Sequence, residues 1–424
     1  MLQTRLILST TSALRLRTLP CLREERRFRK RVAQPLLPPP ITVNPDQYSA
    51  VTEGGAGGST SSYFPPLSAF RTSQTDPAKL DKSHLGRFYT VDNEFYKGVM
   101  NPIQCYPPEF RQNCSTFGEV CVMIRKPFVD IKSCIEASDM KKPVIRYIIY
   151  GPPGSGKTMT MCCLAHYGFV QEYILVNVPW APLWTRFNKE IVQSPTRPGF
   201  FDHTINAVTW LTHFKIQNAK LLTQLDLKTQ KRYEWSKREE TSEGSNLLDI
   251  VEHGIARPAH ASECIYALLS DLKSLSSNQK CKTMVLIDGI NALYYECIKI
   301  KRPDRTLVPP NMITAFEAFK EAIKPDWSGG VVVSTVDKLA GQNEIRESDL
   351  PRYLLTKDGW EHFDPFIPVR VENYTSQEVQ TTIDYFLDRK WLQHPQAGSE
   401  FGRIELEYLS TRNPLTLMKL CNFR

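Results

Sequence analysis

The sequence of 424 residues has no cysteine pattern that would indicate a disulfide framework or a metal centre. Its 11 cysteines include no Cys-x-x-Cys pair, and no histidine stands at the spacing of a zinc site. Several of these cysteines lie in apolar segments, as buried free thiols do. We therefore expect neither structural zinc nor disulfides.

Long apolar runs and repeats are missing as well. No stretch of about 18 apolar residues occurs, so no membrane span is expected, and no internal repeat is visible. The body of the chain also lacks a strong charge. The formal net charge is +8, but residues 1–31 carry nine Arg or Lys and two Glu, hence +7, which leaves +1 for the rest. Global charge therefore does not indicate nucleic-acid binding.

Two local basic segments remain after this correction. Residues 228–238 interleave cations with Tyr233 and Trp235, a combination that could grip phosphates and stack on unpaired bases. Residues 299–305 form a second basic loop. Each composition is more often that of a solvated helix face or loop, so both interpretations stay open.

The N-terminus has the composition of a targeting segment. Residues 1–23 contain four arginines and many Ser and Thr, with no acid before Glu24 and no uninterrupted apolar core. This is typical of a mitochondrial transit peptide, which we predict for residues 1–31; the alternative is a basic tail that contacts nucleic acid. Residues 32–78 are rich in Pro, Gly and Ser without an apolar period, and are predicted to be a disordered linker.

A phosphate-binding loop is the strongest functional signal. An apolar strand at 144–150 runs directly into Gly-Pro-Pro-Gly-Ser-Gly-Lys-Thr at 151–158, and a helical pattern follows at 159–167. The glycines let the backbone wrap a phosphate, and the start of the helix points N–H groups at the anion. Lys157 would reach the β- and γ-phosphates, and the Thr158 hydroxyl would bind Mg²⁺. The predicted nucleotide-binding residues are Gly151, Gly154, Ser155, Gly156, Lys157, Thr158 and Met159.

A second strand supplies an acid. Residues 283–287 are an apolar run that ends at Asp288, which would hold Mg²⁺ through water; the alternative is an aspartate that caps a turn. Many P-loop ATPases place a glutamate next, but this chain has Gly289. Asn291 could orient a water molecule but is a poor base. We predict Asp288 and Asn291 as candidate catalytic residues, and hydrolysis that is slow or needs help.

The remaining pattern predicts an α/β fold of the P-loop NTPase class, with a parallel sheet and helices on both faces. Further strands are predicted at 173–178, 330–335 and 366–371. Thr335, like Ser334 before it, ends a strand where related folds place a γ-phosphate sensor. The 130 residues between Thr158 and Asp288 predict a largely helical insertion near 180–262. We interpret Trp184, Trp210 and Trp235 in this insertion as packing anchors.

The predicted domains beyond the linker are an N-terminal extension at 79–139, the P-loop domain at 140–372 and a small helical lid at 373–424. In the extension a helix is predicted at 115–123. In the lid, Thr375 begins a capping box before a helix at 379–391. A second lid helix is predicted at 400–410, and Asn413-Pro414 opens the last one.

Several stretches resemble the death-associated protein family of the mitochondrial small ribosomal subunit: 121–127, 145–157, 233–239, 285–293, 364–368, 373–374 and 391–394. The P-loop is shared with many unrelated proteins, but its combination with Asp-Gly-Ile-Asn at 288–291 and Asp-Pro-Phe-Ile-Pro at 364–368 is specific. The similarity runs from about residue 80 to the C-terminus. The family usually has a charged residue after the first glycine of the loop, where this chain has Pro152 and Pro153.

The resemblance implies an AAA-related fold that binds GTP or GDP with Mg²⁺ on the head of the small subunit, among its rRNA and ribosomal proteins. It also implies a mitochondrial matrix location and a role in programmed cell death, and it leaves contacts with the large subunit open. Guanine itself comes from the resemblance alone, since the Asn-Lys-x-Asp signature of Ras-like GTPases is absent.

Three hypotheses for the function follow. The first is a structural ribosomal protein with a folded-in nucleotide. The second is a slowly hydrolysing GTPase whose cycle acts in ribosome assembly or death signalling. The third, a small-molecule kinase, is disfavoured because no clustered lid arginines accompany the loop. The missing glutamate after Asp288 favours the first over the second.

Overall fold

The computed structural model describes residues 70–186, 190–295, 306–341 and 348–422, all within the unit Phe64–Arg424. The predicted transit peptide at 1–31, the linker up to residue 69 and the basic loop at 299–305 lie outside the described residues. No helix in the described part of the chain is long and apolar enough to cross a membrane.

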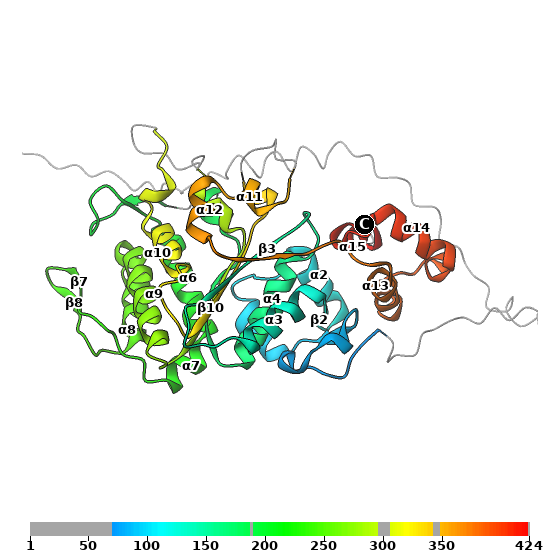
Figure 1. Cartoon of the computed structure of the whole chain (residues 1–424), viewed down its shortest axis with the longest axis horizontal. Coiled ribbons are helices and arrows are strands. Elements are labelled where there is room, and N and C mark those ends of the chain that lie inside the picture. Colours follow the sequence, from blue (N-terminus) through cyan, green and yellow to red (C-terminus); the bar gives the residue numbers. More distant parts are fainter. Residues whose placement is uncertain (1–69, 187–189, 296–305, 342–347, 423–424) are drawn as a thin grey trace, which may run out of the picture. The chain divides into compact units, whose positions relative to one another are not determined.

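A parallel sheet of five strands forms the centre, in the order β11-β3-β10-β9-β4 (Figure 1). All five strands were predicted from apolar runs, and four of these runs are almost entirely buried because both faces of the sheet are covered. The strands are β3 (Ile145–Tyr150), β4 (Tyr173–Val178), β9 (Lys282–Ile287), β10 (Gly330–Thr335) and β11 (Ile367–Arg370).

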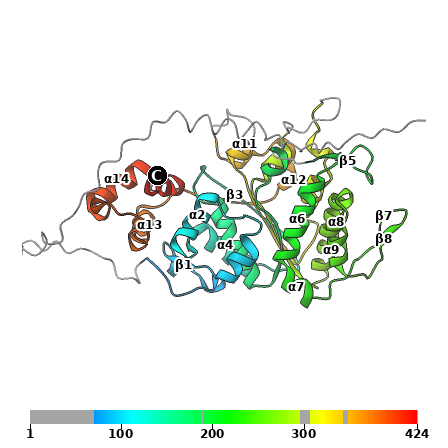
Figure 2. The same cartoon turned by 180° about the vertical axis from the view of Figure 1, so that it is seen from behind.

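Helices cover both faces of this sheet (Figure 2). Alternate residues of a strand enter different cores: in β4, Ile174 and Val176 join one apolar cluster, whereas Tyr173 and Leu175 join the other. The first cluster is completed by α6 (Thr204–Gln217), α8 (Leu247–Ala256), α9 (Ala261–Ser277) and α10 (Thr314–Ala322). The second is completed by α3 (Lys126–Ala137) and α4 (Lys157–Val170). The predicted α/β class with a parallel sheet is confirmed.

The segment before the sheet differs from the prediction in one element. The helix predicted at 115–123 is wrong: α2 (Pro108–Phe117) ends at Gly118, which adopts a left-handed φ of 69°. After this stop, β2 (Cys121–Met123) pairs antiparallel with β1 (Phe88–Thr90), and all three of its residues are buried. Phe70 is already buried, nine residues ahead of the predicted start of the extension at residue 79.

The predicted helical insertion lies between β4 and β9 and also contains two short hairpins. The tryptophans predicted as packing anchors, Trp184, Trp210 and Trp235, are buried in the first cluster, which confirms this prediction. Besides α6 and α8, its elements are α5 (Pro182–Arg186), β5 (Val192–Gln193), β6 (Phe201–Asp202), α7 (Ala219–Gln224), β7 (Tyr233–Ser236) and β8 (Glu239–Thr241).

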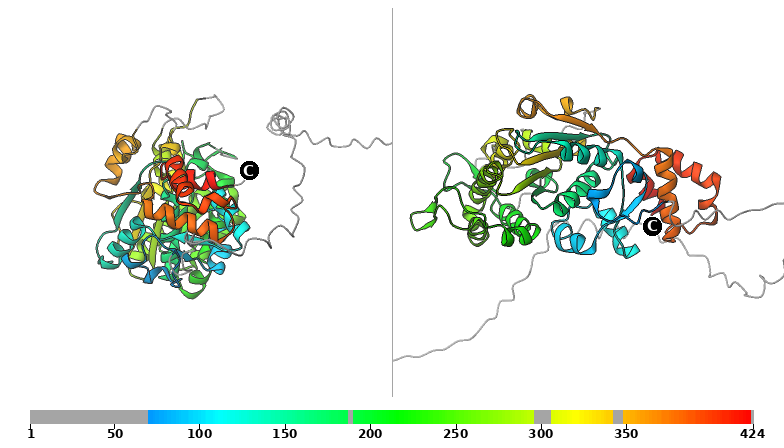
Figure 3. Two further views of the ribbon diagram at one scale, coloured as in Figure 1. Left: turned by 90° about the vertical axis from the view of Figure 1, so that its right-hand side faces the viewer. Right: turned by 60° about the horizontal axis from the view of Figure 1, so that its bottom comes forward.

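Three α-helices occupy residues 373–424, the segment predicted as a helical lid. The capping box at Thr375 is confirmed, because its side chain accepts a hydrogen bond from the Glu378 N–H and the Glu378 side chain accepts one in return. A third apolar cluster packs these helices against the β1–β2 ribbon (Figure 3). The lid helices are α13 (Ser376–Asp388), α14 (Glu400–Ser410) and α15 (Pro414–Cys421), preceded by α11 (Pro351–Leu354) and α12 (Lys357–Phe363).

Short 3-10 helices connect several of these elements. They are η2 (Pro77–Lys79), η3 (Lys82–His84), η5 (Pro258–His260), η6 (Ile290–Tyr294), η7 (Pro310–Met312), η8 (Lys338–Ala340) and η9 (Pro395–Gly398), with one π-helical turn, η4 (Phe95–Met100).

Candidate functional site

The loop between β3 and α4 has the backbone that a phosphate cradle requires. Gly151, Gly154 and Gly156 have φ values of 145°, 78° and 104°, a region that side chains disfavour. A Cβ on Gly151 would also collide with the carbonyl oxygen of Val371. These glycines therefore serve both the curvature of the loop and its packing.

The N-terminus of α4 is open toward a ligand. Gly156 is its N-cap residue, no side chain caps it, and its first turn contains no acid. The first N–H groups of a helix lack partners within it and attract anions. Ser155, just before the helix, is fully buried, and its hydroxyl has no hydrogen-bond partner among the described residues.

The Lys157 ammonium group is held inside the loop. It is 4% exposed and donates to the carbonyl oxygens of Gly151 at 2.8 Å and Pro152 at 2.9 Å. It also forms an ion pair of 2.7 Å with Asp337, which follows β10. To reach a phosphate, the ammonium group would exchange these partners for phosphate oxygens. The Asp337 carboxylate therefore neutralises the charge of Lys157 in this structure.

Two threonines converge on Asp288 at the end of β9. Thr158 donates its hydroxyl to one carboxylate oxygen at 2.7 Å, and Thr335 donates to the other. The parallel register explains this meeting, because Ile287 lies opposite Ser334. The Gly289 N–H in turn donates to Thr335 at 2.8 Å. Burial raises the pKa of Asp288 to about 6.

The candidate water-orienting residue is already engaged. The buried Asn291 amide donates to the carbonyl of Asp337 at 3.0 Å and accepts from its N–H at 3.1 Å. Asn291 therefore positions Asp337, and through it Lys157. A role in orienting water would need this pair of hydrogen bonds to break.

The position after Asp288 has no room for a base. Gly289 has a φ of 73°, and a Cβ there would lie 3.0 Å from a Pro182 carbon and 3.2 Å from both Ala340 and Trp180. A glutamate would have to displace this packing and adopt a disfavoured backbone. Glycine at 289 is a packing requirement, and it excludes the acid that many P-loop ATPases use.

The lid contacts the loop directly, through residues that local sequence patterns do not reveal. The Asn413 amide donates to the Pro153 carbonyl at 3.0 Å, and the Leu415 N–H donates to the Gly154 carbonyl at 3.2 Å. Arg125 joins the same parts: it donates to the Ser155 carbonyl at 2.7 Å and pairs with Glu378 of α13 at 3.1 Å. Arg125 is inside one of the resembling stretches, but no motif assigned it a role.

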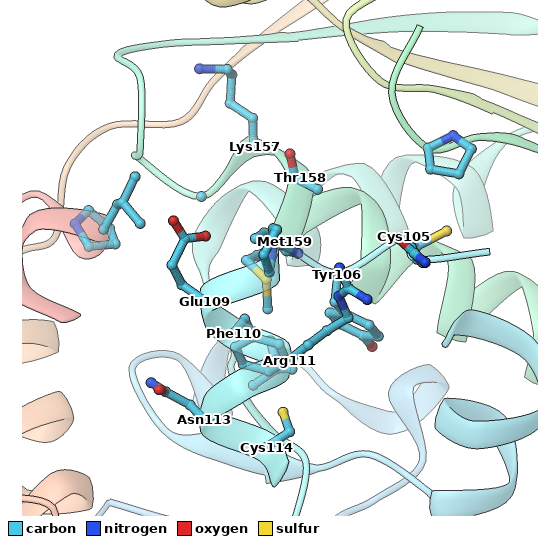
Figure 4. A pocket seen from close by; sticks show the side chains of 18 of the residues that line it. Cys105, Tyr106, Glu109, Phe110, Arg111, Asn113, Cys114, Lys157, Thr158 and Met159 are labelled. Carbon is cyan, nitrogen blue, oxygen red and sulfur yellow. The ribbon is translucent and has the colours of Figure 1, made fainter. Parts of the chain in front are cut away.

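A pocket of about 970 Å³ adjoins the loop (Figure 4). Residues 154–159 line one side of it, with Lys157, Thr158 and Met159 visible in the close-up. Tyr106 and Phe110 line another part, together with tryptophans of the insertion. The volume is in the range of small-molecule and cofactor sites, which combine apolar walls with a few polar groups.

Comparison with known proteins identifies the family of this chain. The sequence model of the family described as mitochondrial ribosomal death-associated protein 3 matches residues 122–420. The Small ribosomal subunit protein mS29 of Mus musculus is 35% identical over 84% of this chain and 90% of its own length. The protein of the same name from Bos taurus is 36% identical over 83% and 88%, respectively.

A solved structure, the AAA domain of FIGL-1, matches with a TM-score of 0.30 and 11% identity, over 79% of this chain and 72% of that one. The family model and the two relatives confirm the resemblance seen in the sequence and the predicted mitochondrial location. The chain belongs to the mitochondrial ribosomal death-associated protein 3 family.

Proposed function

We propose that this chain is a structural protein of the mitochondrial small ribosomal subunit that holds GTP or GDP with Mg²⁺ as a stabilising cofactor. Family membership supports the ribosomal part. One observation carries the nucleotide part: Lys157, Thr158 and Asp288 converge at the uncapped start of α4, beside the 970 Å³ pocket. Guanine is taken from the family.

The residues present fit the proposed ligands. Backbone N–H groups of the loop and of α4 would hold the phosphates, and Lys157 would neutralise the β- and γ-phosphates. The Thr158 hydroxyl and the Asp288 carboxylate, the latter through water, supply the oxygen ligands that Mg²⁺ prefers. Bound Mg²⁺ would neutralise phosphate charge. The apolar walls of the pocket would accept a base.

The ribosomal partners follow from the family: small-subunit rRNA and proteins, with large-subunit contacts left open. The β7–β8 hairpin supports phosphate contact rather than base stacking. Its Tyr233 hydroxyl is bonded to Asp271 at 2.7 Å and Trp235 is buried, whereas Lys237 and Arg238 in the turn are exposed. A role in programmed cell death rests on the family resemblance.

The first prediction concerns nucleotide stabilisation. Excess nucleotide at a hundredfold of its Kd should add about 2.7 kcal/mol to the free energy of unfolding. For a unit of about 350 residues this raises Tm by about 4 °C. The double variant Lys157→Gln/Asp337→Asn should lose this shift, because the phosphates lose their cation. Thermal unfolding with MgGTP, MgGDP and MgATP measures it.

Asp337→Asn alone is the matched control and should keep the nucleotide shift. Lys157→Ala alone is unsuitable, since it leaves the Asp337 carboxylate unpaired and lowers the stability without nucleotide as well. If nucleotide raised the Tm of the double variant as much as that of the control, Lys157 would not be the cation that binds the phosphates. An equal response to ATP and GTP would remove guanine from the proposal.

The second prediction concerns hydrolysis, the basis of the alternative GTPase function. Position 289 has no space for a base, and the Asn291 amide is hydrogen-bonded to Asp337. We therefore expect turnover far below the usual enzyme range of about 1–10³ per second. Single-turnover hydrolysis of radiolabelled GTP by the purified chain measures the rate. A rate near about 1 per second without a partner would favour the GTPase cycle instead.

A further inference from the structure

A second cluster of ligating side chains lies away from the nucleotide site, where the β7–β8 hairpin meets α8 and η5 (Figure 1 labels β7, β8 and α8). Glu239 comes from β8, His253 from α8 and His260 from η5. One ligand atom from each lies within 4.8 Å of the other two. Sequence spacing did not reveal this group, because six residues separate the histidines and the glutamate comes from a hairpin.

The distances suit a metal ion. His253 Nε2 lies 3.1 Å from His260 Nδ1, and His260 Nδ1 lies 3.9 Å from Glu239 Oε2. Zinc binds nitrogen and oxygen at about 2.0–2.2 Å, so two ligands of a tetrahedral site lie roughly 3.3 Å apart. The two nitrogens are already near this spacing, and a small rotation of the glutamate would complete three ligands. Water would take the fourth position.

The side chains around the cluster hold it in place. The Trp235 ring stacks on His253, with centroids 5.2 Å apart, and His253 stacks on His260 at 5.4 Å. Arg257 binds the other oxygen of Glu239 at 2.7 Å, which leaves Oε2 to face the histidines.

We propose that Glu239, His253 and His260 bind a divalent transition-metal ion, Zn²⁺ by the chemistry of the donors, and that the ion fastens the β7–β8 hairpin to α8. Two imidazoles and one carboxylate are a ligand set typical of zinc. This proposal departs from the expectation of no structural zinc, which considered spacing along the chain alone. A direct hydrogen bond between the two rings is the competing explanation of their contact.

Titration calorimetry with Zn²⁺ on the chelator-treated full chain tests the site. The native protein should bind one ion here, and His253→Gln/His260→Gln should weaken this binding by about tenfold or more. Glu239→Gln, which keeps both rings, should weaken it as well. His394→Gln, at an exposed histidine before η9, is the matched control and should bind as the native protein does.

Circular dichroism checks that each variant is folded, and Co²⁺ replaces Zn²⁺ as a spectroscopic probe. Absorption bands of histidine- and carboxylate-bound Co²⁺ should appear in the native protein and the His394 control, and disappear in the double variant. Native affinity in the double variant would place the ion on thiols and overturn the proposal. Absence of Zn²⁺ binding to the native chain would leave a hydrogen-bonded histidine pair and overturn it equally.

Discussion

Replacing Asp288 by asparagine is expected to stabilise the nucleotide-free protein at pH 7.5 while weakening its binding of Mg²⁺–nucleotide. Burial raises the pKa of this carboxyl from 3.8 to about 6. Keeping it ionised in the folded state therefore costs about 3 kcal/mol at neutral pH. Asparagine removes the charge and can still accept a hydrogen bond from Thr335 and donate one to Thr158.

The sign of the pH dependence follows from the raised pKa. Between pH 3.8 and about 6 the folded protein binds the Asp288 proton more tightly than the unfolded chain does. The contribution of this group to the free energy of unfolding therefore falls as pH rises through that window, and stays low above it. The advantage of Asp288→Asn should be about 3 kcal/mol at pH 7.5 and should vanish near pH 4.

Urea unfolding of both proteins from pH 4 to pH 7.5 measures this advantage, and calorimetry with MgGDP measures the loss of affinity. Asp226→Asn is the control, because that exposed carboxylate pairs with Lys228 at the surface and its loss should change stability by about 1 kcal/mol at most. If Asp288→Asn were less stable than the native protein at pH 7.5, the prediction would be wrong. The hydrogen bonds from the two threonine hydroxyls would then stabilise the carboxylate by more than the burial of its charge costs.

The cost of burying the Asp288 charge bears on the proposed cofactor role. Among the described residues, two hydroxyl donors, Thr158 and Thr335, and the more distant Lys157 charge face the buried Asp288 carboxylate. Bound Mg²⁺–nucleotide would place cationic charge near the carboxylate and return the stability that the empty site lacks. Functional sites commonly hold such locally unfavourable groups.

The sequence predicted those parts of the fold that depend on neighbours along the chain. Apolar runs predicted the sheet because four of its five strands are buried on both faces, and the Thr375 capping box predicted the start of α13. The helix predicted at 115–123 failed because Gly118 ends α2 with a left-handed residue. The apolar residues that follow form β2. A short apolar run is compatible with a helix as well as with a strand.

The site was predicted where a local motif defines it, as in residues 151–158. The partners that hold this motif come from distant segments: the Asn413 amide contacts Pro153 across 260 residues, and Arg125 ties Ser155 to Glu378. Asp337 lies after β10 and meets Lys157 only because β10 neighbours β3 in the sheet. No periodicity or spacing along the chain encodes these meetings, since tertiary packing creates them.

Acid is expected to destabilise the protein through two buried histidines. His203 is fully buried between the rings of Trp184 and Phe316, and burial lowers its pKa to about 4. Burial lowers the pKa of His166, which stacks on Phe95, to about 4 as well. Each histidine should therefore lower the free energy of unfolding by about 3 kcal/mol between neutral pH and pH 4.

The direction is opposite to that of Asp288. An unfolded histidine binds its proton near pH 6.5, whereas these two resist protonation until about pH 4. The unfolded chain thus binds more protons within this window, and the free energy of unfolding falls as pH drops through it. The two histidines together should remove about 6 kcal/mol, of which the Asp288 carboxyl returns about 3 kcal/mol in the native protein.

His203→Leu isolates one of these contributions with little change in volume. Any packing cost of leucine is present at both pH values, so the informative quantity is the change in stability between pH 7.5 and pH 4 within each protein. Urea unfolding should show that His203→Leu loses about 3 kcal/mol less than the native protein over this range. His394→Gln, at an exposed histidine, should follow the native curve. If the free energy of unfolding of His203→Leu fell as much between pH 7.5 and pH 4 as that of the native protein, the prediction would be wrong. His203 would then become protonated in the folded state at little cost, through water that enters beside α6.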